Sequence, residues 1–113
     1  MSCLFCRIVA GEIPAQIIYE DEQCLAFRDI NPQAPTHVLV IPRKHIAMLA
    51  DATDDDEGVL GRLLLAGAHV ARDEGLSESG FRTVINSGAG AGQSVFHIHV
   101  HIIGGRQLGW PPG

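Results

Sequence analysis

The chain has 113 residues, 46% of them apolar, which is enough for one compact core, and we expect a single domain over residues 1–113. Thirteen acidic against eight basic residues give a formal charge of −5, which argues against a nucleic-acid polymer as partner. No stretch of about 18 apolar residues and no leader pattern occurs, and three cysteines are too few for a disulfide scaffold. We therefore expect a soluble, cytoplasmic protein without a membrane partner.

The first half of the chain predicts a short helix and three strands. Apolar residues with helical spacing predict the helix over residues 3–10, ended by Gly11. Apolar runs at residues 17–19 and 24–27 flank a polar tetrapeptide and predict a hairpin. After a proline-rich loop, residues 37–41 form a third strand that Pro42 closes.

The second half predicts one long helix and two more strands. Thr53 and the acidic run after it are typical of a helix N-terminus, and this helix should extend to about residue 74, with Gly75 as its C-terminal cap. Residues 81–86 predict a fourth strand, 87–93 a glycine-rich loop and 95–103 a fifth strand. Strands grouped around a single long helix predict an α+β fold with a five-stranded, largely antiparallel sheet.

Three histidines alternate with aliphatic residues in the fifth predicted strand: His97, His99 and His101. Alternate side chains share one face of a strand, about 7 Å apart at Cα, so three imidazoles would line that face. A neutral imidazole can attack phosphorus and form a covalent intermediate while a neighbour stabilises charge, and His99 is our candidate nucleophile. Three histidines can also hold zinc, so spacing alone leaves catalysis and metal binding open.

Two further features carry weaker signals. The glycines between Ser87 and Gln93 let backbone N–H groups approach an anion, although the loop lacks the ending of a P-loop and could be a plain connection. Cys3-x-x-Cys6 has the spacing of half a zinc site, or is a pair of buried thiols. Cys24 should be a core residue.

The segment His97-Ile98-His99-Val100-His101-Ile102-Ile103 matches the signature of the histidine triad family. The resemblance extends over nearly the whole chain, through Ile13-Pro14-Ala15, residues 26–30, 32–37 and 92–96, Gly104-Gly105-Arg106 and the ending Trp110-Pro111-Pro112-Gly113. The chain resembles in particular the branch of histidine triad nucleotide-binding proteins, which are purine nucleoside phosphoramidases.

This resemblance implies a function and a set of site residues. It implies a homodimer with joined sheets that hydrolyses the P–N bond of adenosine or guanosine 5′-phosphoramidates to the nucleoside monophosphate, with no cofactor needed for the chemistry. It implies that His99 is transiently nucleotidylated, that His101 contacts the phosphate and that His37 belongs to a supporting relay. The implied nucleotide-binding residues are Asp29 on the ribose, Ile30 on the nucleoside, and Asn86, Gly92, Gln93 and Ser94 around the phosphate and leaving group.

The resemblance also implies a structural zinc site. Vertebrate-type members of the branch lack the Cys-x-x-Cys pair, whereas many bacterial triad proteins and the related uridylyltransferases carry it. In those relatives two cysteines, the histidine of a Pro-x-x-His turn and the first triad histidine bind zinc. The matching residues here are Cys3, Cys6, His45 and His97, which would remove His97 from the chemistry.

Three other functions stay open at this point. A dinucleoside polyphosphate hydrolase of the same superfamily is the alternative enzyme, although the Trp-Pro-Pro-Gly ending favours the phosphoramidase branch. A nucleotide-binding regulatory module would use the same residues with incidental hydrolysis. A purely structural zinc protein would leave His99, His101 and the glycine loop unexplained.

Overall fold

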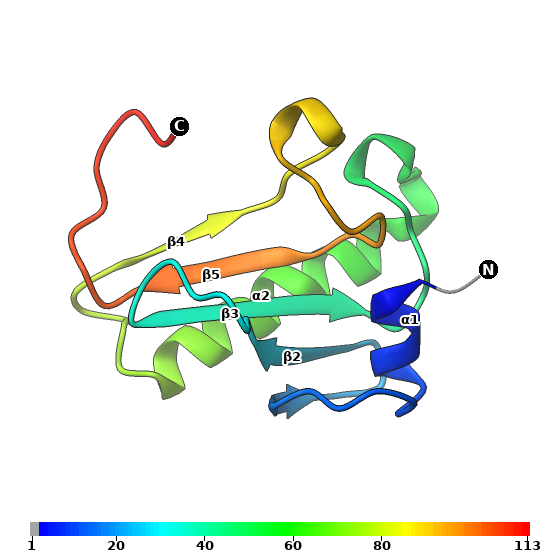
Figure 1. Cartoon of the computed structure of the whole chain (residues 1–113), viewed down its shortest axis with the longest axis horizontal. Helices are drawn as coiled ribbons and strands as arrows, with labels where there is room; N and C mark the ends of the chain where they lie inside the picture. The colour runs from blue at the N-terminus through cyan, green and yellow to red at the C-terminus, as the bar shows by residue number, and fades with distance from the viewer. Residues whose placement is uncertain (1–2) are drawn as a thin grey trace.

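Five antiparallel strands form one sheet in the computed structural model, which describes residues 3–113. The order across the sheet is β1-β2-β3-β5-β4, and every neighbouring pair is antiparallel. Two helices and three short 3-10 turns complete the fold. The elements are α1 (Leu4–Val9), β1 (Ile17–Glu20), β2 (Cys24–Arg28), β3 (Thr36–Pro42), η1 (Leu49–Asp51), η2 (Asp54–Asp56), α2 (Glu57–Asp73), β4 (Phe81–Val84), η3 (Ala89–Ala91) and β5 (Val100–Gly104). The predicted α+β fold is therefore confirmed (Figure 1).

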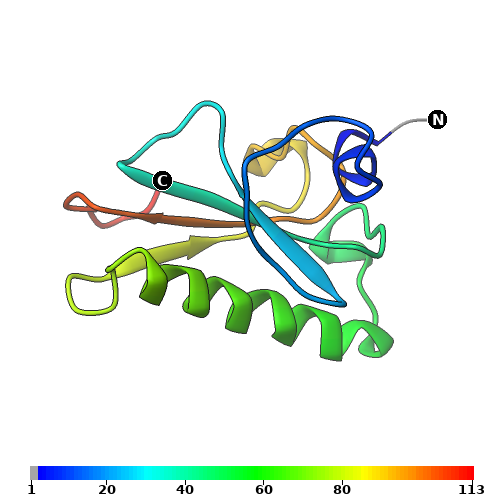
Figure 2. The same ribbon diagram turned by 90° about the horizontal axis from the view of Figure 1, so that it is seen from below.

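The two helices cover opposite faces of the sheet, with α2 along one face and α1 at one end of the other (Figure 2). Because side chains alternate along a strand, each central strand contributes to two apolar clusters. In β3, Val38 and Val40 pack with Leu63 and Val70 of α2, whereas Leu39 and Ile41 pack on the side of α1. The sheet therefore has a large core under α2 and a smaller one beside α1.

The acidic run that the sequence predicts as the first turn of the long helix forms η2 instead, with Thr53 as the N-cap of η2, and α2 follows directly at Glu57. The Asp56 carboxylate accepts a hydrogen bond from the Thr53 N–H at 3.0 Å and one from Lys44 Nζ at 2.6 Å. At the other end, Gly75 has a φ of +77°, in the left-handed region that favours glycine. These contacts hold the turn that leads into α2, and a glycine follows the last turn of the helix.

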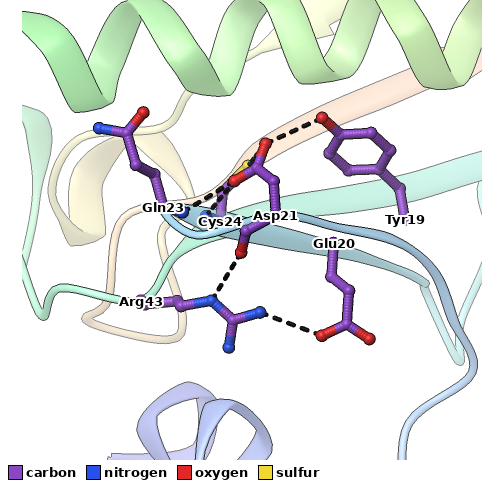
Figure 3. A network of polar contacts seen from close by, with 6 residues as sticks. All are labelled: Tyr19, Glu20, Asp21, Gln23, Cys24 and Arg43. Atoms are coloured by element: carbon purple, nitrogen blue, oxygen red, sulfur yellow. Dashed lines mark hydrogen bonds and ion pairs between the residues drawn. The ribbon is translucent and has the colours of Figure 1, made fainter.

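Asp21 holds the turn between β1 and β2 in a polar network (Figure 3). Its Oδ1 accepts from the N–H groups of Gln23 and Cys24 at 2.8 and 2.9 Å, and its Oδ2 accepts from the Tyr19 hydroxyl at 2.8 Å. Arg43 Nε donates to the Asp21 carbonyl at 2.9 Å, which ties the turn to the end of β3. The Cys24 side chain beside this turn is fully buried, as predicted for a core residue.

The fifth strand is shorter than its sequence suggests. The prediction placed it at residues 95–103, but β5 begins at Val100 because its pairing with β3 starts at Val40 and Val100, and its pairing with β4 starts at Val84 and His101. For the same reason β4 ends at Val84 and does not reach residue 86. The backbone N–H of Ile98 instead donates to the carbonyl of Ile46 at 2.7 Å.

The predicted alternation of side chains continues beyond the end of the strand. Ile98, Val100 and Ile102 are buried in the core under α2. Phe5 of α1, on the other face, packs against the rings of His97 and His99. In the part of the chain described, no helix is both long enough and apolar enough to cross a membrane.

Candidate active site and metal centre

A cavity of about 380 Å³ opens on the face of the sheet that carries α1. This volume falls in the usual range for a small-molecule site. One wall is apolar and includes Leu4, Phe5 and Ile8 of α1. The polar residues predicted for the site that line the cavity are Asp29, Ser94, His99 and His101. Ile30, also predicted, lines the cavity with a fully exposed side chain.

A hydrogen bond to the backbone carbonyl of His97 determines the tautomer of His99. Its Nδ1 lies 2.8 Å from the carbonyl oxygen of His97. A carbonyl only accepts, so Nδ1 carries the proton and donates it, and in the neutral ring the lone pair is left on Nε2. The side chain is 7% exposed and packs edge-on against Phe5, with ring centroids 5.1 Å apart. His99 is therefore held in place by these contacts, and its neutral form has one nucleophilic nitrogen, Nε2.

His101 has the opposite tautomer, which a chain of hydrogen bonds determines. The backbone N–H of Gln33 donates to His37 Nδ1 at 3.0 Å, so the neutral His37 ring carries its proton on Nε2. That Nε2 donates to His101 Nδ1 at 2.9 Å, which leaves the His101 proton on its own Nε2. His101 Nε2 is buried and has no hydrogen-bond partner. The site thus holds an unused N–H donor next to the His99 ring, whose centroid is 5.0 Å away.

His101 stays neutral over the physiological pH range. Burial, together with the neighbouring His99 and His37, lowers the pKa of His101 to about 4. The Asp29 carboxylate raises this pKa, but its effect is smaller. A neutral ring can keep the donor role on Nε2 without adding a positive charge beside His99.

Asp29, His37 and His101 also form a group of potential metal ligands, with donor atoms within 4.8 Å of one another. The hydrogen bonds argue against a metal ion there, because Gln33 occupies His37 Nδ1 and the ring proton must then occupy Nε2, the atom that would bind the metal. The Asp29 carboxylate lies 3.4 Å from that Nε2 and accepts the Asn31 N–H at 2.8 Å. We interpret this group as a hydrogen-bond relay.

The remaining predicted phosphate residues do not line the cavity. Gln93 is 4% exposed and supports the loop from within: its Nε2 donates to the carbonyl of Ala47 at 2.8 Å and its Oε1 accepts from the Gly88 N–H at 2.8 Å. Gly92 has a φ of +93°, which explains a glycine at that turn. Asn86 lies in the segment between β4 and η3. Their contacts with a phosphate stay predictions.

Sequence reasoning missed the contribution of α1 to the cavity. The residues concerned, Leu4, Phe5 and Ile8, have the spacing of an apolar helical stripe, which indicates burial. This spacing could not show that the apolar side of α1 faces both the core and a ligand cavity.

Four potential zinc ligands meet beside the cavity, and we call Cys3, Cys6, His45 and His97 the metal cluster. Their donor atoms lie within 4.8 Å of one another. His97 Nδ1 is 3.4 Å from Cys3 Sγ, 3.5 Å from Cys6 Sγ and 3.2 Å from His45 Nδ1, and Cys6 Sγ is 3.3 Å from His45 Nδ1. Tetrahedral zinc, with bonds of about 2.0–2.1 Å to nitrogen and about 2.3 Å to sulfur, requires N···N near 3.3 Å and N···S near 3.5 Å.

The surroundings of His97 also suit a metal ligand. The ring is fully buried, and its Nε2 lies 2.8 Å from the carbonyl of Pro42, to which it donates. That bond leaves the lone pair on Nδ1, which is directed at the other three donors. Zinc-binding histidines commonly donate their other ring N–H to a carbonyl or carboxylate in this way. The two sulfurs, two nitrogens and their spacing therefore fit a structural zinc ion.

Comparisons with known proteins agree with this description. The profile of the HIT domain matches residues 10–108. An uncharacterized HIT-like protein of Synechococcus elongatus is 56% identical over 110 residues, which cover 97% of this chain and 96% of that protein. The crystal structure of a HIT family hydrolase from Legionella pneumophila has a TM-score of 0.97 and 56% identity, covering 99% of this chain and 100% of that one.

A zinc-bound histidine triad family protein from Mycobacterium smegmatis is also similar, with a TM-score of 0.81 and 40% identity over 100% of this chain and 81% of that one. These likenesses do not single out the phosphoramidase branch. Because the matched residues include the three histidines and the whole sheet, this chain belongs to the histidine triad (HIT) family.

Proposed function

We propose that this protein hydrolyses the P–N bond of purine nucleoside 5′-phosphoramidates and releases the nucleoside monophosphate. The observation that supports this function is the pair of neighbouring imidazoles with opposite tautomers, a lone pair on His99 Nε2 and an N–H on His101 Nε2. A phosphoryl group needs both partners, a nucleophile for phosphorus and a donor for its oxygens.

The reaction proceeds in two displacements. His99 Nε2 attacks phosphorus, the P–N bond to the amine breaks, and the amine leaves with a proton taken from solvent. His101 donates its Nε2–H to a phosphoryl oxygen, and His37 holds His101 in that tautomer. Water then attacks phosphorus, the bond to His99 breaks, one proton returns to solvent, and the His99 ring regains its Nε2 lone pair. His99 Nδ1 keeps its proton throughout, which stabilises the cationic intermediate through the His97 carbonyl.

The rest of the cavity suits a nucleoside. Apolar side chains of α1 and Ile30 offer surface for a purine, and the Asp29 carboxylate can accept hydrogen bonds from ribose hydroxyls. Ser94 lines the cavity, and we assign it, with Asn86, Gly92 and Gln93, to the phosphate and leaving-group side. Gln93 would act there by supporting the glycine loop.

We assign a structural zinc ion to the metal cluster and no metal to the chemistry. The donor spacing and the zinc-bound relative support this assignment. When bound, the ion would bond α1 to the segments that carry His45 and His97. We also propose a cytoplasmic location and a homodimer with joined sheets. The position of β4 at one edge of the sheet supports the dimer, because an edge strand can pair with a second copy.

The decisive test is mass spectrometry of the protein mixed with adenosine 5′-phosphoramidate. We expect a transient adenylyl adduct on His99 and release of AMP. His99→Ala should lose both, while His69→Ala, an exposed histidine of α2, should keep both. A folded His99→Ala variant with full activity would show that the nucleophile is wrong.

Two further measurements, one of turnover and one of binding, separate the alternatives. Faster turnover of diadenosine polyphosphates than of the phosphoramidate, in parallel assays, would favour a dinucleoside polyphosphate hydrolase. Tight AMP binding without any product would favour a regulatory module.

A further inference from the structure

Three separate chain segments connect the metal cluster to the nucleotide cavity. We infer that zinc occupancy of the cluster determines the nucleotide affinity of the cavity, so that metal and nucleotide bind cooperatively. This inference rests on the proposed function, because it takes a purine nucleoside monophosphate as the ligand. It goes further in giving the zinc ion a role in binding as well as in folding.

The first connection is α1. Cys3 and Cys6 contribute their sulfurs to the cluster, and Phe5 between them lines the cavity. Phe5 is 4% exposed and packs against both histidines, at centroid distances of 5.9 Å from His97 and 5.1 Å from His99. A shift of the two sulfurs would therefore move a wall of the cavity and a ring that holds the nucleophile.

The second connection lies within His97 itself. Its side chain belongs to the cluster, while its carbonyl accepts the Nδ1–H of His99 at 2.8 Å. His97 is thus a positioning residue for the nucleophile, since the group that orients His99 is anchored by the cluster.

The third connection runs from His45 to the glycine loop. The carbonyl of Ile46, next in the chain, accepts from the Ile98 N–H at 2.7 Å, and that of Ala47 accepts from Gln93 at 2.8 Å. Gln93 in turn accepts from the Gly88 N–H. The cluster therefore also supports the loop proposed to face the phosphate.

The ion matters because little else attaches α1 to the sheet by polar contacts. The helix has six residues, too few to be stable alone. Within residues 3–113, the side-chain hydrogen bonds between α1 and the remainder of the protein all involve Cys6 Sγ, and Cys3 beside the helix adds one more to His97. Thiols form weak hydrogen bonds, whereas zinc bonds would link all four residues. Removing the ion should leave α1 held mainly by the apolar packing of Phe5, Ile8 and Val9.

The test compares AMP binding by the zinc-loaded and the chelator-treated full chain, using calorimetry and measured zinc content. We expect one zinc per chain and an AMP affinity at least about tenfold lower without it, equivalent to about 1.4 kcal/mol. By reciprocity, AMP should raise zinc affinity by the same factor in a chelator competition. Adding zinc back should restore AMP binding.

A matched pair of variants separates the cluster from general damage. His45→Gln replaces an exposed ligand and should reproduce the zinc-free AMP affinity, whereas His69→Gln, an exposed histidine outside the cluster, should leave both affinities unchanged. Phe5→Leu should keep zinc affinity but weaken AMP binding. Hydrogen exchange should show faster exchange in α1 on zinc removal, with α2 still protected.

Each contrary outcome has a distinct meaning. Equal AMP affinity with and without zinc, or a chain that binds no zinc, overturns the coupling and leaves the proposed chemistry intact. Global unfolding on zinc removal, with α2 exchanging as fast as α1, also overturns it, because the ion would then only stabilise the fold. Absence of AMP binding in every form contradicts the proposed function instead.

Discussion

Acidification from pH 7 to pH 5 should destabilise the folded protein through His101. Burial and the neighbouring His99 and His37 lower the pKa of this ring to about 4 in the folded state, whereas a histidine in an unfolded chain titrates near about 6.5. Below about pH 6.5 the His101 ring is protonated in the unfolded chain, whereas in the folded protein it is protonated only near pH 4. The stability contribution of His101 is therefore present above the unfolded pKa and lost as the pH falls toward the folded pKa.

The size of this effect follows from the pKa difference. A shift of about 2.5 pH units corresponds to about 3.4 kcal/mol when the pH is below both pKa values, and to about 2 kcal/mol at pH 5. His101 is only partly buried and borders the cavity, so water screens some of the interaction. We expect a loss of about 1–2 kcal/mol in the free energy of unfolding between pH 7 and pH 5.

Urea unfolding at pH 7, 6 and 5 measures this loss in the wild type, His101→Gln and the control His69→Gln. Glutamine does not titrate, so the pH-dependent loss in His101→Gln should be smaller by about 1–2 kcal/mol. His69 is exposed and forms an ion pair with Asp73 at 3.5 Å on the surface of α2, so its replacement should leave the wild-type pH dependence nearly unchanged. If His101→Gln and the wild type lose the same stability, the neutral, buried state assigned to His101 is incorrect.

Three other substitutions test separate parts of the fold. Gly105 has a φ of +92°, and a Cβ there would lie 2.9 Å from the Cβ of Pro35, so Gly105→Ala should lower the free energy of unfolding by about 1–3 kcal/mol, measured by thermal melting. The control Gly61→Ala adds its Cβ to open space on α2 and should stabilise by up to about 1 kcal/mol; equal effects would contradict the strain. Glu74 accepts two hydrogen bonds from Arg28, at 2.8 and 3.0 Å, which lower its pKa against the effect of burial. Glu74→Gln should therefore cost about 1 kcal/mol at pH 7, and the difference from wild type should vanish as the pH falls through the lowered pKa of Glu74; a difference that persists in acid would contradict the ion pair. Gln93→Ala should cost about 1–3 kcal/mol in urea unfolding and speed amide exchange in residues 87–94, because the Gly88 N–H loses its acceptor; unchanged exchange would argue against the supporting role.

Features of the chain that depend on local backbone geometry were predictable from its sequence. The alternation of His97, His99 and His101 with aliphatic residues placed the imidazoles opposite the core because a period of two separates the faces of any extended segment. Thr53 and the acidic run after it marked the start of the helical segment, where they form η2 directly before α2, because capping involves residues three apart. The fold class was predictable because the strands and the long helix each show their own local period in the sequence.

Features that depend on residues distant in the chain required the tertiary structure. β5 is shorter than its alternating pattern because a strand extends only as far as its partners do, and pairing with β3 starts at Val100. The tautomers of His99 and His101 depend on the carbonyl of His97 and on a relay that begins at Gln33. Spacing could not specify these acceptors and donors.

The metal cluster shows the same division. The Cys3-x-x-Cys6 spacing indicated half of a zinc site, and the family resemblance suggested the other half, His45 and His97. Only the folded chain brings their nitrogens within 3.2 Å of each other and places Phe5 between the cluster and the nucleophile. The sequence by itself determined which side chains are chemically able to act, because residue types and local periods are written in it. The tertiary structure decided which of them share protons, ligands and a cavity, because those depend on contacts across as many as 94 positions of the chain.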